Sequence, residues 1–167
     1  QGKPCTLEPV MALESEVVTI KSIRKGDAVS YNRTWTAECD TVLATLPNGY
    51  ADGLPRNLSP GLCVAINGKN YPVVGRICMD QCMVDVGSSG VHRWDKAVIF
   101  GPENSGALQT AADIAKASDT SAASVAHAGR RSLPSVSITA PKGVLKNTSA
   151  PRPSLRSATK RVPRAEV

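Results

Sequence analysis

Two short polar segments hold the residue types that could do chemistry, 49–56 (GYADGLPR) and 75–81 (GRICMDQ). In the first, glycines flank Tyr50-Ala51-Asp52, which predicts a tight loop that presents a phenol and a carboxylate. Both groups can transfer protons. Spacing alone favours a plainer interpretation, a hairpin loop with a packed tyrosine.

Other catalytic and binding motifs have little support. His92 and His127 are the two histidines, and a catalytic triad would have to be built on His92. The sequence contains neither GxxxxGK[ST] nor GxGxxG, so nothing predicts a phosphate cradle. Cys78 and Cys82 are four residues apart, but no second cysteine or histidine pair follows at ligand spacing, which favours packing over metal binding.

Composition divides the chain into a body and a tail. The 167 residues give room for one ordinary domain and carry a net charge of +6. Residues 121–167 contain nine basic side chains and one acidic one, and every aromatic residue lies between positions 31 and 100. We therefore expect a folded body over 1–120 and a low-complexity, disordered basic tail over 121–167. Without an aromatic side chain to stack on bases, the tail does not favour a nucleic-acid partner.

The composition also bears on location. No run of 18 apolar residues and no signal-peptide pattern occurs, so we expect no membrane partner. Five cysteines, an odd number, indicate free thiols in a reducing compartment. These features predict a cytoplasmic protein.

Short apolar runs separated by turn residues indicate strands. The runs are 17–20, 28–31, 41–46, 63–66, 69–74, 76–86 and 98–101. The clearest local signal is Asn67-Gly68, which supplies the positive φ angles of a two-residue hairpin turn. In 76–86, alternation would place Cys78, Asp80 and Cys82 on one face of a strand.

One helix is expected at about 110–118, with Thr110 as N-cap, Asp113 completing a capping box, and Ile114 with the alanines on its buried face. The predicted fold class is all-β, a small β-barrel or sandwich of about six to eight strands with one short helix, followed by the basic tail.

Four blocks resemble one known family in the correct order. They are PVMALES (9–15), KGDAVSY (25–31), LPNGYADG (46–53) and VGRICMDQ (74–81). From about 9 to 120 the chain resembles the carboxy-terminal β-domain of alanine racemase, the pyridoxal-phosphate enzyme that interconverts L- and D-alanine. The resemblance covers about two thirds of this chain.

The resemblance implies roles for six residues. Tyr31 matches the catalytic tyrosine, which reaches into a partner subunit's active site and moves the α-proton. Met79 matches the residue whose backbone amide meets the substrate carboxylate, with Asp80 beside it. Three further residues match the substrate entryway: Tyr50, Arg56 and Arg76. A free tyrosine titrates near pH 10, at about three units above neutrality, so a tyrosine acting as base needs cationic neighbours.

The sequence departs from the family in three ways. The family's amino-terminal (β/α)8 barrel has no counterpart here, and neither does the lysine that holds the cofactor. Asn32 stands where glycine usually follows the catalytic tyrosine, which is expected to shift that loop. After Thr120 the family continues with a Tyr-Glu pair and a final strand, whereas this chain has Ser121-Ala122-Ala123.

The resemblance therefore implies the carboxy-terminal domain of an alanine racemase, an isomerase that supplies D-alanine for peptidoglycan. Its partners would be alanine and a second racemase subunit or the missing amino-terminal domain, which would hold pyridoxal 5'-phosphate. We expect this chain alone to be inactive. The alternative is a non-catalytic β-barrel that serves as a binding module.

Overall fold

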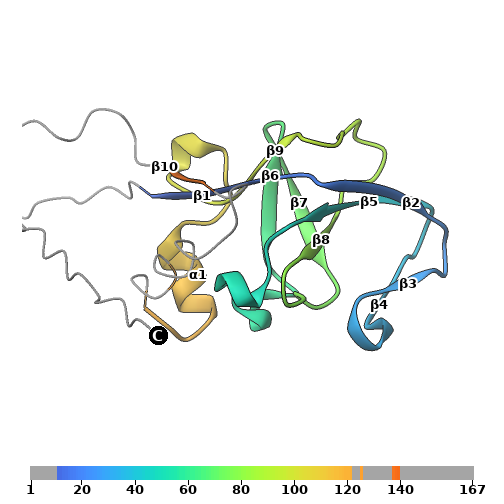
Figure 1. Cartoon of the computed structure of the whole chain (residues 1–167), viewed down its shortest axis with the longest axis horizontal. Coiled ribbons are helices and arrows are strands. Elements are labelled where there is room, and N and C mark those ends of the chain that lie inside the picture. The colour runs from blue at the N-terminus through green and yellow to red at the C-terminus, as the bar shows by residue number, and fades with distance from the viewer. Residues whose placement is uncertain (1–10, 122–124, 126–136, 140–167) are drawn as a thin grey trace, which may run out of the picture.

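The computed structural model describes residues 11–121, 125 and 137–139, and eight of its strands form one curled antiparallel sheet (Figure 1). The order across the sheet is β10-β1-β9-β6-β7-β8-β5-β2. These strands are β1 (Ala12–Glu16), β2 (Thr19–Ile23), β5 (Thr41–Leu46), β6 (Cys63–Ile66), β7 (Lys69–Val74), β8 (Cys82–Asp85), β9 (Lys96–Phe100) and β10 (Ser137–Thr139). A separate two-stranded pair joins β3 (Ala28–Val29) to β4 (Trp35–Thr36). The predicted small all-β fold is confirmed, and α1 (Ala111–Ala117) is its one complete α-helix within the described residues.

The first two strands are consecutive in the chain but pair with different strands of the sheet. Strand β1 pairs with β9, and β2 pairs with β5. Between them, the Val17 N–H donates to the Asp95 carbonyl at 3.0 Å and the Val18 N–H donates to the Thr45 carbonyl at 2.9 Å. Figure 1 shows β1 and β2 nearly in line. This continuous segment links both margins of the sheet around one core.

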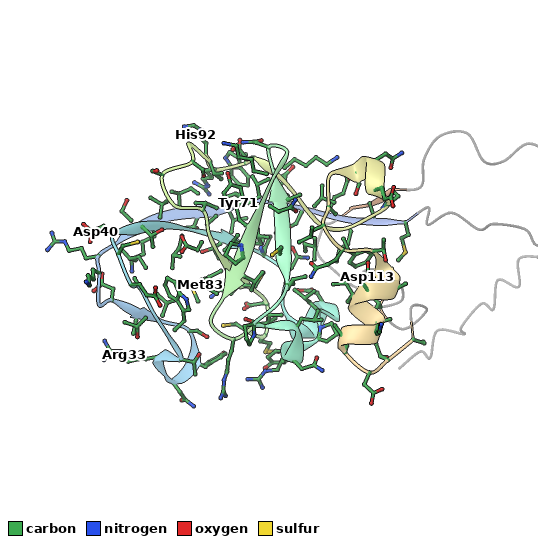
Figure 2. The ribbon with its side chains drawn as sticks, turned by 180° about the vertical axis from the view of Figure 1, so that it is seen from behind. Arg33, Asp40, Tyr71, Met83, His92 and Asp113 are labelled. Atoms are coloured by element: carbon green, nitrogen blue, oxygen red, sulfur yellow. The ribbon has the colours of Figure 1, made fainter. Side chains whose placement is uncertain are left out.

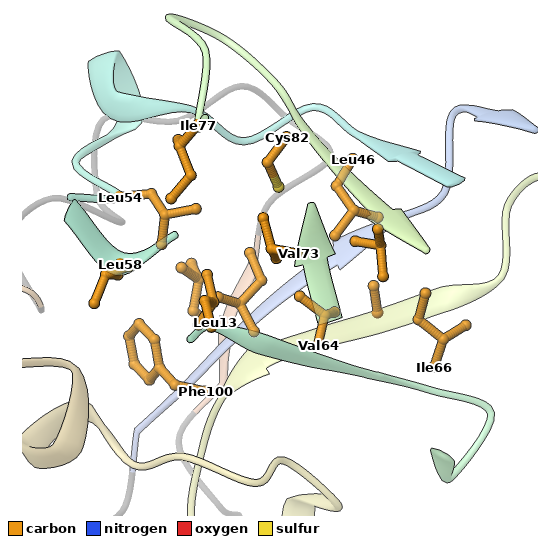
Figure 3. Close-up of a cluster of buried hydrophobic side chains, with 14 of the residues drawn as sticks. Leu13, Leu46, Leu54, Leu58, Val64, Ile66, Val73, Ile77, Cys82 and Phe100 are labelled. Atoms are coloured by element: carbon orange, nitrogen blue, oxygen red, sulfur yellow. The ribbon is translucent and has the colours of Figure 1, made fainter. Parts of the chain in front are cut away.

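The core is made mostly of aliphatic side chains from the concave face of the sheet (Figure 3). Leu46, Val64, Ile66 and Val84 are fully buried and come from three strands, β5, β6 and β8. Leu54, Leu58 and Ile77 reach the same core from loops rather than strands. The loops that carry the predicted site residues are therefore anchored from below by apolar contacts.

Several local predictions are confirmed. The β6–β7 hairpin has the expected bounds, and its turn has φ 52° at Asn67 and φ 75° at Gly68. Helix α1 spans Ala111–Ala117, and its Thr110–Asp113 capping box forms as predicted. Of its apolar residues, Ile114 and Ala115 are buried, while Ala112 and Ala117 are exposed.

Two predictions about strands are wrong. The segment 76–86 is a strand only over Cys82–Asp85. Residues 76–81 form a loop, because backbone carbonyls there accept hydrogen bonds from Tyr50 and Ala51 and not from a neighbouring strand. The predicted strand over 28–31 ends at Val29, and Tyr31 begins a 3-10 turn, η1 (Tyr31–Arg33).

The expectation of a disordered tail lies mostly outside the described residues. Where the tail is described, it contributes to the fold. Ser137–Thr139 pairs with the free edge of β1 as β10, and Val125 is buried in the core. The boundary at residue 120 and the disordered tail therefore stay predictions.

Candidate active-site loops

The first candidate loop begins directly after β5 and contains two short 3-10 turns, η2 (Tyr50–Asp52) and η3 (Arg56–Leu58). The Gly49 N–H donates to the Asp52 carboxylate at 2.9 Å, and the Gly53 N–H donates to the Tyr50 carbonyl at 3.1 Å. Asp52 therefore stabilises the turn itself. With Leu54 and Leu58 held in the core, the Tyr50 side chain is left 39% exposed.

The second loop, 75–81, is fastened to the first through its backbone. The Tyr50 N–H donates to the Cys78 carbonyl at 2.9 Å, and the Ala51 N–H donates to the Met79 carbonyl at 2.8 Å. Gly49 makes this approach possible, since a Cβ there would overlap the Met79-Asp80 peptide. Gly49 thus lies where the two loops meet.

Met79 points outward from this junction. Its side chain is 56% exposed, while Ile77 two residues earlier is fully buried. Within the described part of the chain, no hydrogen-bond acceptor is recorded for the Met79 N–H, although the Met79 carbonyl is bonded. A backbone donor beside an exposed loop can bind an anionic group such as a carboxylate.

Charged groups gather around the same junction. The Arg56 guanidinium lies 5.0 Å from the centre of the Tyr50 ring. Burial raises the pKa of the Cys78 thiol, the Asp80 carboxylate raises it further, and Arg56 opposes both. The positive charge of Arg56 and the negative charge of Asp80 therefore have opposite effects on the same thiol, that of Cys78. Cys82, fully buried beneath, has a pKa raised by burial and by Cys78 to about 12, so this thiol is a packing group.

Tyr31 lies on a different loop, the one that joins β3 to β4. Its side chain is 52% exposed. Figure 2 labels Arg33, from the same turn, at the end of the molecule away from Asp113 of α1. The Ser30 hydroxyl accepts a hydrogen bond from the Arg76 N–H at 2.7 Å. This contact joins the Tyr31 loop to the start of the 75–81 loop.

The structure thus brings Tyr50, Arg56, Met79 and Asp80 into one cluster of two loops, and it attaches Tyr31 to that cluster through the backbone of Arg76. Asn32, where a shift of the loop is expected, adopts φ 59° and ψ 21°. This is the left-handed region, which asparagine tolerates better than most residues.

Comparison with known proteins decides the family. The family model described as "Alanine racemase, C-terminal domain" matches residues 10–136. The chain belongs to the alanine racemase C-terminal domain family. It is 55% identical over 117 residues to the alanine racemase of Treponema denticola, and 50% identical over 116 residues to that of Mycolicibacterium vanbaalenii. Each alignment covers 68% of this chain, but only 31% and 30% of the relatives.

Solved alanine racemases share the fold. The enzyme from D-cycloserine-producing Streptomyces lavendulae matches with a TM-score of 0.67 and 39% identity, over 73% of this chain and 32% of that one. The alanine racemase from Streptomyces coelicolor matches with a TM-score of 0.67 and 40% identity, over 74% of this chain and 32% of that one. The chain therefore spans about a third of the length of the alanine racemases that it matches.

The described residues do not fit covalent attachment of pyridoxal phosphate, which needs a lysine at the site. The described lysines lie in or near β2, at the β7 and β9 starts, and in α1: Lys21, Lys25, Lys69, Lys96 and Lys116. None lies in the loops 49–58 and 75–81 or in the β3–β4 loop that carries Tyr31. In the same described ranges, no group of three or more His, Cys, Asp or Glu could hold a metal ion, and no helix is long and apolar enough to cross a membrane.

Sequence reasoning missed the contacts that hold these loops together, although it assigned Gly49 to a tight loop. Ser30, Gly49 and Gly75 each lie next to a residue that the alanine racemase resemblance singles out. Their importance comes from contacts between loops far apart in the chain, which spacing does not reveal. The available signal was a glycine directly before Tyr50 and before Arg76, whereas nothing comparable marks Ser30.

Proposed function

We propose that this chain is the substrate-facing β-domain of a pyridoxal-phosphate-dependent alanine racemase that interconverts L- and D-alanine. The observation that supports it best is the backbone junction of the loops 49–58 and 75–81, which presents Met79, Arg56 and Tyr50 together. The family match supplies the reaction.

In this proposal each residue of the chain has a limited task. The Tyr31 phenol takes or returns the α-proton of alanine, and its exposure lets it reach into a site formed with another polypeptide. The Met79 N–H binds the substrate carboxylate, with Asp80 beside it. Tyr50, Arg56 and Arg76 line the path by which alanine enters.

The cofactor belongs to the partner in this scheme. Because the described lysines lie away from the three loops, the amino-terminal part found in the longer relatives would hold pyridoxal phosphate. The partner is that domain or a second racemase subunit. The chain alone is then expected to be inactive.

Inactivity of the isolated chain is tested directly. The purified 167-residue chain is mixed with pyridoxal phosphate and L-alanine, and absorbance and formation of D-alanine are followed. We expect no specific internal-aldimine absorbance, beyond that of pyridoxal phosphate with free amines alone, and no racemisation above the same mixture without protein. Either signal would contradict the assignment of the cofactor to a partner.

The role of Tyr31 is tested in a chimera that carries the full chain behind the amino-terminal part of the Treponema denticola racemase. We expect the chimera to racemise alanine and Tyr31→Phe to lower kcat by about 10²- to 10⁴-fold, the usual contribution of a general acid–base group. Tyr71→Phe removes the same hydroxyl from β7 and is the matched control. Equal activity of the two variants would refute the role of Tyr31.

A further inference from the structure

The loop that carries Tyr31 is attached to the 75–81 loop through the side chain of Ser30. The Ser30 Oγ accepts from the Arg76 N–H at 2.7 Å and donates to the Arg76 carbonyl at 3.2 Å. A single hydroxyl therefore uses its donor and its acceptor on the backbone of one residue, 46 positions away in the chain. Two bonds to one peptide segment define position better than one bond does.

Gly75 leaves the space that this contact needs. A Cβ at Gly75 would overlap the Ser30 Cβ and would lie 2.9 Å from its Oγ. The Trp35 Cβ, on β4, would be 3.7 Å away. Any side chain at position 75 would thus push the Tyr31 loop away from the 75–81 loop.

The backbone on both sides of Tyr31 depends on outside support. Ser30, Asn32 and Arg33 have φ values of 74°, 59° and 52°. Residues with side chains are rarely stable in this region unless the surrounding structure enforces it. Two contacts do so here: the Arg33 N–H donates to the Ser30 carbonyl at 3.0 Å, and the Ser30 hydroxyl holds Arg76.

We propose that Ser30 is a positioning residue, whose hydroxyl fixes the Tyr31 loop on the Arg76 backbone and so sets the place of the Tyr31 phenol relative to Met79. The inference rests on the proposed function, in which Tyr31 moves the proton and Met79 binds the carboxylate. Ser30 itself touches no reacting atom and acts through Tyr31.

Kinetics in the chimera test this role. Ser30→Ala is expected to lower kcat for L-alanine by about 10- to 100-fold, while KM changes less than about threefold, because the proton-transfer geometry is lost and the carboxylate contact is kept. Ser30→Gly removes the hydroxyl too, but relieves the positive φ. If the role were only structural, kcat would follow stability, and Ser30→Gly would be as active as wild type. That result would overturn the proposal.

A double-variant cycle tests whether Ser30 acts through Tyr31. In the Tyr31→Phe background, Ser30→Ala is expected to lower kcat no further. The same loss with and without the Tyr31 phenol would refute the positioning role.

Gly75→Ala offers an independent test, with Gly68→Ala as the matched control. Both glycines have positive φ, 66° and 75°, but a Cβ at Gly68 meets nothing within 4 Å. We expect Gly75→Ala to lower kcat at least tenfold and Gly68→Ala to leave it unchanged. In the Ser30→Gly background, where the collision partner is gone, Gly75→Ala should cause little further loss. A loss as large in that background as in wild type would contradict the contact.

Amide hydrogen exchange on the isolated 167-residue chain separates this proposal from the proposed function. Ser30→Ala is expected to speed exchange of the Arg33 N–H at least tenfold, while the Val73 N–H, bonded to the Leu62 carbonyl at 2.8 Å, is unchanged. An inactive wild-type chimera would contradict the proposed function alone. Unchanged exchange at Arg33 would overturn the role of Ser30.

Discussion

Trp94 occupies a backbone conformation that suits glycine. Its φ is 75°, and its ring is 58% exposed, so burial does not explain the choice of tryptophan. The Arg93 guanidinium lies 4.5 Å from the ring centre, an exposed cation–π contact that contributes about 0.5–1 kcal/mol. The Trp94 N–H donates to the Val17 carbonyl at 2.7 Å, which holds the turn in place.

Trp94→Gly and Trp94→Ala separate the backbone cost from the ring contact. Both remove the ring, but only glycine relieves the positive φ, so Trp94→Gly should be more stable than Trp94→Ala by about 1 kcal/mol. Urea unfolding of the full chain measures the difference. Equal stability of the two variants would show that the turn carries no backbone strain.

At the scale of elements, α1 depends on its cap. Asp113 accepts hydrogen bonds from the Thr110 N–H at 2.8 Å and from the Thr110 hydroxyl at 2.7 Å. These bonds, the backbone one first, lower the pKa of the Asp113 carboxyl below its ordinary 3.8. The helix in turn places Ile114 and Ala115 in the core.

Asp113→Ala removes the N3 half of the capping box and should cost about 1 kcal/mol at neutral pH. Because the folded-state pKa of Asp113 is lowered, its contribution is complete above pH 3.8 and disappears as the pH falls through the folded value. The variant and wild type should therefore converge in acid. Glu38→Ala, which removes an exposed carboxylate, is the control, and a gap that persists unchanged below the folded pKa would contradict the explanation.

Elements governed by local chemistry could be predicted from the sequence. Asn67-Gly68 determines the β6–β7 turn, and Thr110 with Asp113 starts α1, because those interactions lie within a few residues. Loop 76–81 could not be predicted, since its hydrogen bonds go to Tyr50 and Ala51. Alternating apolar residues there satisfy the strand pattern, but Ile77 and Cys78 are buried from a loop.

Residue patterns predicted less of the candidate site than of the fold. Spacing alone favoured a packed tyrosine at position 50, and the four family blocks supplied the roles. The two-sided hydroxyl of Ser30 and the close approach at Gly49 are long-range contacts. Their residue types are common in any loop, so only the folded backbone reveals them.

At the scale of the whole molecule, the sheet closes where β1 gives way to β2. Val17 is fully buried there, whereas its neighbour Val18 is partly exposed, because the chain passes from one margin of the sheet to the other. The Val17 N–H donates to the carbonyl of Asp95, directly before β9, and the Val18 N–H donates to the carbonyl of Thr45, in β5. Packing at this crossing holds the two margins together.

Val17→Ala is expected to lower the free energy of unfolding by about 2 kcal/mol, since the two lost carbons leave a cavity in a core that cannot collapse fully. Val18→Ala is the adjacent control with the same chemical change and should cost less than about 1 kcal/mol. Urea unfolding measures both. Equal losses of unfolding free energy would mean that the Val17 side chain is not packed more tightly than that of Val18.

The segment after residue 120 tests where the folded domain ends. Composition changes at residue 120, but the family match continues to 136, Val125 is buried, and β10 pairs with β1.

Chains ending at 139, 136 and 120 should therefore unfold at successively lower urea concentrations. The first cut removes three residues of strand pairing, about 1 kcal/mol. The second removes the buried side chain of Val125 from the core, about 1.5–3 kcal/mol. If the chain ending at 120 were as stable as the chain ending at 139, the boundary in composition would also be the boundary of the fold. A loss of stability at each cut would instead mean that the basic, low-complexity segment stabilises the domain that carries Tyr31.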